Sequence, residues 1–321
     1  MNATGPVNRV GLHRQLSRIH VEGARPRLSE MDKIKEASVY LRMRLGSFKP
    51  LILLTLGSGL GDLAAQIENP IEISYSDIPG FPRPKSQVEG HAEKFVAGML
   101  NGVPVIAMCG RFHLYQEGIT PADVVRPVRT LLNMADIRHF IVTNAAGGAI
   151  KGNKPGDVML ITDQIDNTHK VLPTVFEMEP QFADKSEVYS KELIGLIEDV
   201  VLENDLISIY NGVYWGNHGP DYETPAEVVM AQVSGGMTVG MSTVKETSAV
   251  ARYNVKAIKE GRPTVKVAGF SYITNPAAGT VAGVTLDHDD VKAAAGDETG
   301  VENFTNIILL TVKEIHRRHV A

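Results

Sequence analysis

Residues 51–61 read Leu-Ile-Leu-Leu-Thr-Leu-Gly-Ser-Gly-Leu-Gly, an apolar run that passes directly into a glycine-rich stretch. Residues 51–56 have the length and composition of a buried strand. Glycines after such a strand let backbone N–H groups turn toward an anion, and a helix that begins there adds its dipole. We therefore predict a strand over 51–56 followed by an anion site, with Ser58 as a hydroxyl donor.

Two other interpretations of this glycine stretch stay open at this point. A dinucleotide site needs the spacing G-x-G-x-x-G, whereas residues 57–61 give G-x-G-x-G, and no acidic residue ends a clear second strand about 20 residues later. A plain tight turn needs only the glycines themselves. The choice among the three depends on what the other strand ends carry.

The rest of the chain alternates strand-like and helix-like segments. Strands rich in Val, Ile and Leu are predicted at 103–108, 139–143, 158–162, 238–242 and 264–273. Helices are predicted from an N-cap at Ser29 to residue 45, and at 121–134, 190–203, 225–233, 248–259 and 289–320. This alternation predicts an α/β fold with three layers, α/β/α, around a central mixed β-sheet. Such sheets place their sites at the carboxyl ends of the strands.

Composition narrows the class of protein. Of the 321 residues 43% are hydrophobic and 21% are charged, and the net charge of −5 gives no basic footprint for nucleic acid. No apolar stretch approaches the roughly 18 residues that a membrane span needs. The single cysteine, Cys109, rules out an internal disulfide and points to a reducing compartment. We expect a cytoplasmic protein with neither nucleic-acid nor membrane partners.

The first 28 residues differ from the rest, because they carry five arginines against one acid, Glu22. We expect residues 1–28 to be a disordered N-terminal extension and residues 29–321 to form a single domain. An Arg-rich, acid-poor leader is also typical of organellar transit peptides, which is the minority alternative.

Anion donors recur at further strand ends. Arg111 and His113 follow the strand 103–108, and an arginine there suits a bidentate grip on phosphate. The small residues of Thr143-Asn144-Ala145-Ala146-Gly147-Gly148 let a ligand approach the backbone closely. Gly240-Met241-Ser242-Thr243 ends another strand with hydroxyls. Donors at four strand ends favour a phosphate site over simple packing.

These motifs, taken in order, resemble the trimeric purine nucleoside phosphorylases from about Met31 to the C-terminus. The segments that carry the resemblance are Leu56-Gly57-Ser58-Gly59-Leu60-Gly61, Ile78-Pro79-Gly80-Phe81-Pro82, Gly90-His91, Gly110-Arg111-Phe112-His113, Thr143-Asn144-Ala145-Ala146-Gly147-Gly148, Gly219-Pro220, Tyr222-Glu223-Thr224, residues 239–244 and Ile273-Thr274-Asn275. Together they are highly specific.

The resemblance implies a role for each matching residue. The implied phosphate-binding residues are Ser58, His91, Arg111, His113, Asn144, Ala145 and Ser242. The implied nucleoside-binding residues are Tyr115, Ala146, Gly147, Tyr222, Glu223, Val239, Gly240, Met241, Thr274, Asn275 and His288. Of all these, His113, Glu223, Asn275 and His288 are the implied catalytic residues, with Glu223 and Asn275 on the purine and His288 at the 5′-hydroxyl.

The implied activity is phosphorolysis of inosine, guanosine and their deoxy forms to a free purine and ribose 1-phosphate, by a homotrimer. Phosphate is a co-substrate, and neither a cofactor nor a metal is expected because Arg and amide donors supply the positive field. With Asn275 and His288 present, 6-oxopurines with a free 5′-hydroxyl are favoured. The alternatives are a xanthosine- or methylthioadenosine-preferring phosphorylase, and a non-catalytic nucleoside or phosphate sensor on the same fold.

The sequence also departs from the family pattern. Gln116 adds one residue after Tyr115, and Lys245 stands where a proline is common. The segment after residues 163–165 is shortened before Phe182, although in the family it brings an aromatic side chain to the neighbouring subunit's ribose. Phe176 is the candidate for that part. We expect these departures to affect base preference and efficiency more than the type of reaction.

Overall fold

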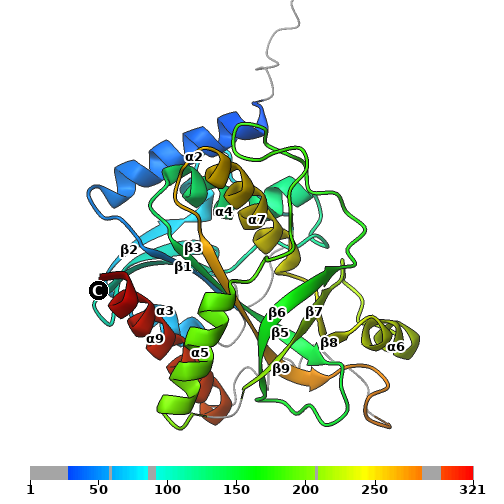
Figure 1. Ribbon diagram of the computed structural model, residues 1–321. Coiled ribbons are helices and arrows are strands. Elements are labelled where there is room, and N and C mark those ends of the chain that lie inside the picture. Colours follow the sequence, from blue (N-terminus) through cyan, green and yellow to red (C-terminus); the bar gives the residue numbers. More distant parts are fainter. Residues whose placement is uncertain (1–27, 58–59, 86–91, 207–208, 284–297, 321) are drawn as a thin grey trace, which may run out of the picture.

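A single mixed sheet organises the computed structural model, which describes residues 28–57, 60–85, 92–206, 209–283 and 298–320 (Figure 1). Within these residues the sheet has nine strands in the order β2-β3-β4-β1-β5-β8-β7-β6-β9. The strands are β1 Ile52–Leu56, β2 Glu68–Ser74, β3 Lys94–Leu100, β4 Val103–Cys109, β5 His139–Gly148, β6 Val158–Asp166, β7 Ile209–Gly216, β8 Gly236–Gly240 and β9 Lys266–Pro276.

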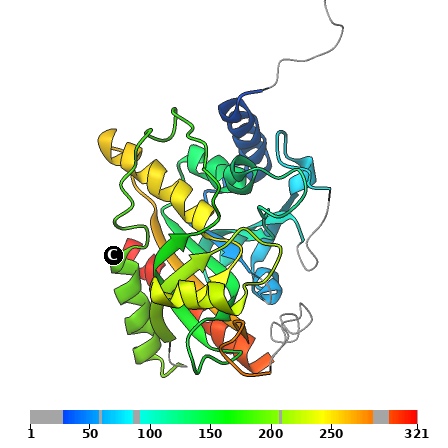
Figure 2. The same ribbon diagram turned by 90° about the vertical axis from the view of Figure 1, so that its right-hand side faces the viewer.

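Helices cover both faces of this sheet. They are α2 Glu30–Leu45, α3 Gly61–Ala65, α4 Pro121–Met134, α5 Lys191–Glu203, α6 Pro225–Val233, α7 Val244–Lys259 and α9 Glu298–Val320, with a short 3₁₀ helix at Tyr75–Asp77. In Figure 1, α2, α4 and α7 lie on one side of the sheet and α5 and α9 on the other, and the perpendicular view keeps them apart (Figure 2). Each group closes its own apolar core, so the predicted three-layer α/β/α fold is confirmed.

Several helix starts follow directly from local sequence. Ser29 and Asp32 form a reciprocal capping box at the start of α2, as do Thr120 and Asp123 at α4. Such boxes satisfy backbone N–H groups that would otherwise lack partners in the first turn. Helices α4 and α6 begin and end at the predicted residues.

Strand β5 links two parts of the sheet. It pairs with β1 on one side, and its last residues pair with both β8 and β9. Since β8, β7, β6 and β9 are also neighbours in that order, these four strands and β5 close into a ring. The motif-bearing ends of β5, β8 and β9 thereby lie side by side.

Several predicted element bounds were wrong. Strand β6 runs to Asp166 rather than residue 162 and β9 to Pro276 rather than residue 273, and for three other bounds the structure gives a physical reason. Strand β5 runs to Gly148 rather than residue 143, because its small residues fit between β8 and β9. Helix α7 begins at Val244 rather than residue 248, because its charged first turn is buried and paired. Strand β8 ends at Gly240 rather than residue 242, where the chain turns sharply.

Strands β2, β3 and β7 were not predicted. Strand β2 is largely exposed, and glycines interrupt the apolar pattern of the other two. A Cβ at Gly212 in β7 would overlap the sulfurs of Met159 and Met237. The glycine that weakens the strand signal is therefore required by close packing.

The N-terminal extension lies outside the described residues except for Leu28, and so does the start of the helix predicted at 289–320. Among the described residues, none of the helices combines the length and the apolar composition that a membrane crossing requires.

A buried ion pair fastens the connection between β6 and α5, residues 167–190, to the helical layer. Arg129 of α4 donates from Nε and Nη2 to the two carboxylate oxygens of Glu179 at 2.7 and 2.8 Å. Both side chains are at most 1% exposed. Arg129 also donates to the Pro173 carbonyl at 2.7 Å, and Arg252 of α7 donates to the Leu172 carbonyl at 2.8 Å.

We expect Arg129→Met to lower the free energy of unfolding by about 3–5 kcal/mol, because it leaves the Glu179 charge buried without its bidentate partner. Chemical denaturation monitored by fluorescence and circular dichroism measures this. The matched control is Arg317→Met, which removes an ion pair with Glu314 on the surface of α9 and should leave stability unchanged. Equal effects of the two variants would contradict this account.

Candidate active site

The end of β1 is held tightly against β5. The Gly57 N–H donates to the Thr143 hydroxyl at 2.8 Å, and that hydroxyl donates to the Thr55 carbonyl at 2.9 Å. A Cβ at Gly57 would lie 3.1 Å from the Asn144 Cα, so a larger residue would push the strands apart. The glycine loop that follows therefore starts from a fixed point, although Ser58 itself lies outside the described residues.

Arg111 is buried behind this point, only 3% exposed. One guanidinium nitrogen donates to the Thr143 carbonyl, and Nη1 lies 3.5 Å from the Glu246 carboxylate in the first turn of α7. Burial raises the pKa of Glu246, and the Arg111 charge opposes that rise. The Tyr75 hydroxyl fixes the preceding residue by donating to the Gly110 carbonyl at 3.0 Å. The cation is thus set in place by groups from β5 and α7.

Ser242 sits at a strained turn that connects β8 to α7. Thr243 has φ 68° and ψ −56°, and the Val244 N–H donates to the Ser242 carbonyl at 2.7 Å. These values describe a γ-turn of the rare, strained kind. Side chains hold it, since Asn144 Nδ2 donates to the Thr243 hydroxyl at 2.9 Å and the Ser242 hydroxyl lies 3.2 Å from that of Thr243. Strain kept in place by its surroundings is common at functional sites.

The Tyr214 hydroxyl of β7 also holds the turn at Ser242 in place. It accepts a hydrogen bond from the Ser242 N–H at 3.2 Å, and burial raises the pKa of Tyr214 to about 12. A Cβ at Gly240 would lie 2.5 Å from that hydroxyl. Gly240 therefore has to be a glycine for Tyr214 to reach Ser242.

His113, Tyr115 and Met241 form a second part of the site. The rings of His113 and Tyr115 stack with centroids 4.9 Å apart. Gly219 has φ +75°, and a Cβ there would come within 2.6 Å of the Met241 sulfur and 2.8 Å of the Tyr115 ring. The additional residue Gln116 folds back, and its side chain accepts from the His113 N–H at 2.7 Å. Gln116 thus folds against the backbone of His113, while Tyr115 and Met241 both lie close to Gly219.

Glu223 lies just before α6 and is 9% exposed. Asn217 Nδ2 donates to its Oε1 at 2.5 Å. Burial raises the pKa of the Glu223 carboxyl, and the hydrogen bond from Asn217 opposes that rise. Tyr222, next to it, is half-buried.

Sheet register brings Asn275 to the same end of the sheet. Gly147 of β5 pairs with Val239 of β8 and with Asn275 of β9, and Val239 pairs with Trp215 of β7. The Asn275 Nδ2 donates to the Pro276 carbonyl at 3.1 Å, and its Oδ1 accepts from the Thr274 hydroxyl at 3.0 Å. The Thr274 hydroxyl is also 3.4 Å from the Ala146 carbonyl.

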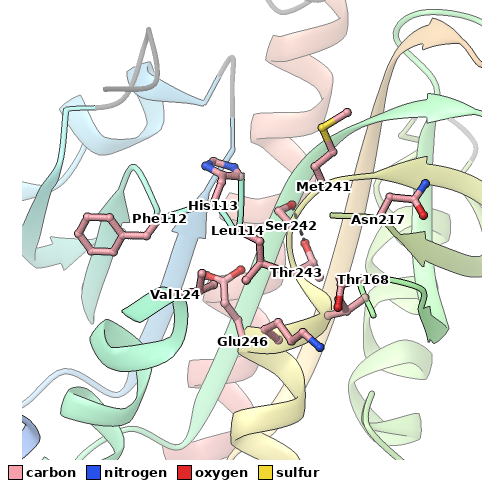
Figure 3. A pocket seen from close by; sticks show the side chains of 12 residues that line it. Phe112, His113, Leu114, Val124, Thr168, Asn217, Met241, Ser242, Thr243 and Glu246 are labelled. Atoms are coloured by element: carbon pink, nitrogen blue, oxygen red, sulfur yellow. Dashed lines mark hydrogen bonds between the residues drawn. The ribbon is translucent and has the colours of Figure 1, made fainter. Parts of the chain in front are cut away.

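Residues of the turn at Ser242 and of the group formed by His113, Tyr115 and Met241 line one cavity. Figure 3 shows His113 on one side and Asn217 on the other, with Met241 and Ser242 between them in this view. Thr168, Thr243 and Glu246 line it as well. The described part of the chain holds no group of three or more His, Cys, Asp or Glu side chains arranged to bind a metal ion.

Lys245 occupies the position where the family commonly has proline. Its Nζ lies 2.6 Å from the Asp166 carboxylate and also donates to the Lys170 carbonyl. A cation is unfavourable in the first turn of a helix, so the Asp166 partner offsets that cost. The pair ties the start of the shortened segment to the turn that carries Ser242. Phe176, in contrast, is 63% exposed in the single chain.

Of the residues that the motifs predicted, His113, Met241 and Ser242 line the cavity. Arg111, Asn144 and Glu223 contact residues that line it, and Asn275 is placed at the same sheet end by register. Ser58, His91 and His288 lie outside the described part. Sequence reasoning missed Asn217, Tyr214 and the pairing role of Glu246. Only Glu246 left a signal, namely a charged residue shortly after the predicted strand 238–242. Tyr214 lies on β7 and Asn217 directly follows it, and a glycine hid the apolar pattern of this strand.

Comparison with known proteins agrees with this geometry. The sequence profile of the phosphorylase superfamily matches residues 51–312. Purine nucleoside phosphorylase 1 of Geobacillus stearothermophilus is 44% identical over 262 residues, which is 80% of this chain and 89% of that protein. The Bacillus subtilis protein of the same name is 42% identical over 263 residues, 81% of this chain and 91% of its own.

Solved structures are similar as well. Isoform 2 of the Schistosoma mansoni purine nucleoside phosphorylase, solved with cytosine and ribose-1-phosphate, has a TM-score of 0.75 and 32% identity over 87% of this chain and 95% of its own. The fold, the strand-end site and these likenesses agree, and the chain belongs to the phosphorylase superfamily, within its purine nucleoside phosphorylases.

Proposed function

We propose that this enzyme binds inorganic phosphate between the ends of β1, β4, β5 and β8, and a 6-oxopurine nucleoside between Glu223 and Asn275. Its reaction is phosphorolysis of purine nucleosides to the free base and ribose 1-phosphate, so a purely sensory role is set aside. The observation that carries the phosphate assignment is the buried Arg111 guanidinium, held between the Thr143 carbonyl and the Glu246 carboxylate.

The chemistry explains why a fixed cation is useful there. Cleavage of an N-glycosidic bond builds oxocarbenium-like positive charge on the sugar. A phosphate held beneath the ring stabilises that charge and then bonds to the anomeric carbon. Arg111 and Ser242 are positioned before the reaction, so little reorganisation accompanies it.

The purine side needs the opposite kind of help, because the departing base becomes electron-rich. A donor near N7 and an acceptor for N1–H stabilise the leaving group more than the bound nucleoside. Asn275 Nδ2 carries a second hydrogen besides the one given to the Pro276 carbonyl, and we assign it to N7. Glu223 would accept from N1–H.

The enzyme should depend strictly on phosphate and on Arg111. We expect Arg111→Ala to lower kcat/KM for phosphate and inosine by at least about a hundredfold, because the charge-assisted grip on the nucleophile is lost. Initial rates of hypoxanthine release at varied phosphate measure this. Arg44→Ala, on the exposed face of α2, is the control and should retain full activity. Near-normal turnover of Arg111→Ala at low phosphate would disprove the assignment.

Base choice should follow the carboxamide of Asn275. Inosine and guanosine should exceed adenosine by at least about a hundredfold in kcat/KM, since adenine leaves buried polar groups unpaired. Asn275→Asp should narrow the gap because it accepts from a 6-amino group. Steady-state rates on the three nucleosides test this, and equal kcat/KM for adenosine and inosine in the unmodified enzyme would contradict it. Xanthosine shares the 6-oxo edge, so its acceptance is compatible with this role of Asn275.

We further propose that the enzyme is a homotrimer. The connection 167–190 exposes three large apolar side chains, Val171, Phe176 and Phe182, at 83%, 63% and 83% in the single chain. Neighbouring subunits would cover such side chains. Light scattering at micromolar concentration should give three times the mass of one chain, and a stable monomer would overturn the proposal.

A further inference from the structure

We propose that Asn217 is the positioning residue of the base site: it holds the Glu223 carboxylate in one orientation, as a hydrogen-bond acceptor, and so contributes to base selectivity. This inference rests on the proposed placement of the purine at Glu223. It goes further by assigning the control of that carboxylate to a residue outside the family motifs.

The orientation of the Asn217 carboxamide is fixed by its neighbours. Its Oδ1 accepts from Trp215 Nε1 at 2.9 Å and from Asn167 Nδ2 at 2.8 Å. An indole N–H can only donate, so the oxygen of Asn217 has to face Trp215. The Nδ2 group consequently faces Glu223, where it lies 2.5 Å from Oε1.

Backbone hydrogen bonds fix the positions of Asn217 and of its neighbour Asn167. The Asn217 N–H donates to the Gly240 carbonyl at 2.7 Å, and the Asn167 N–H donates to the Gly216 carbonyl at 2.9 Å. The network therefore joins the ends of β6, β7 and β8, next to Met241 and Ser242. Asn217 itself lines the cavity (Figure 3).

The chemical consequence falls on Glu223. Because an amide N–H donates, Oε1 of Glu223 has to accept and cannot carry a proton toward Asn217. Burial is the largest influence on the Glu223 pKa and raises it, and the charge of Glu227 in α6 adds to that rise. The hydrogen bonds from Asn217 and from the Glu223 backbone lower this pKa. The Glu223 charge in turn contributes to the raised pKa of Tyr214 of β7. Asn217 thus favours the ionised form against desolvation.

An ionised, oriented carboxylate selects among purines. It accepts from the N1–H of a 6-oxopurine, whereas N1 of adenine is itself an acceptor and meets repulsion. A protonated Glu223 would instead donate to adenine N1. Asn217 therefore acts on base choice from the Glu223 side, independently of Asn275.

Two substitutions at residue 217 separate this role from simple scaffolding. Asn217→Asp keeps the acceptor for Trp215 and Asn167 but places a second carboxyl against Glu223, and two carboxyls so close share one proton. That proton is lost as pH rises, so the ratio of variant to unmodified kcat/KM for inosine should fall toward alkaline pH.

Asn217→Leu removes the donor instead, so the Glu223 pKa rises further. Glu223 then becomes protonated at a higher pH than in the unmodified enzyme. The ratio of variant to unmodified kcat/KM for inosine should therefore fall as the pH is lowered from about 8 to about 5.5. At the lowest pH of this range the preference of Asn217→Leu for inosine over adenosine should shrink by about tenfold. Dividing by the unmodified enzyme cancels the titration of phosphate and of the nucleoside.

The control is Asn211→Leu, since Asn211 lies on β7, the strand that ends just before Asn217, is exposed and donates to the Glu198 carboxylate at 2.6 Å. It should leave the pH profile unchanged. Opposite pH trends for the two residue-217 variants support the proposal, whereas equal losses at all pH values, or none, would overturn it.

Glu223→Gln distinguishes the two levels of the argument. If it retains full activity on inosine, the base assignment under the proposed function is wrong. If it loses activity while both residue-217 variants keep the unmodified pH profile, only the role of Asn217 is wrong. Thermal melting of every variant identifies any loss due to unfolding.

Discussion

The pairing of β5 with three other strands is the constraint on which the rest of the structure depends. Its first half lies parallel to β1, and its last residues are hydrogen-bonded to both β8 and β9. Only small side chains fit there, because a Cβ at Gly147 would already lie 3.2 Å from Val239 and 3.4 Å from Asn275. This crowding draws the proposed phosphate and purine positions to one end of the sheet.

Charges around that end are paired before any ligand arrives. Two consecutive residues at the start of α7 serve different partners, since Lys245 pairs with Asp166 and Glu246 pairs with Arg111. The first pair anchors the connection 167–190, and the second orients the cation assigned to phosphate. The connection 167–190 and the proposed phosphate site are therefore linked through the first turn of α7. The Arg129–Glu179 pair fastens the same connection from the other side.

The two sides of the proposed base site differ in how their polar groups are set. Asn275 is fixed by its own neighbours in sequence, Thr274 and Pro276. Glu223 is fixed by Asn217, whose orientation in turn depends on the indole of Trp215. In the proposed site, base selectivity thus has one determinant inside the family motifs and one in a hydrogen-bond network that joins the ends of three strands.

The sequence by itself determined the α/β class, most helices, the strands with unbroken apolar runs, and the family with its motif residues. These depend on local periodicity, capping residues and spacing, which a linear chain displays. Only the tertiary structure decided that 144–148 is strand, that α7 starts at Val244, and that Asn217, Tyr214 and Glu246 belong to the site. Each of these depends on partners distant in the chain. The small residues 144–148 form a strand because β8 and β9 pair with them, and the charged first turn of α7 is buried because Arg111 and Asp166 pair with its side chains. Local sequence carries no record of such partners, because the free energy that fixes them arises only when the strands pack together.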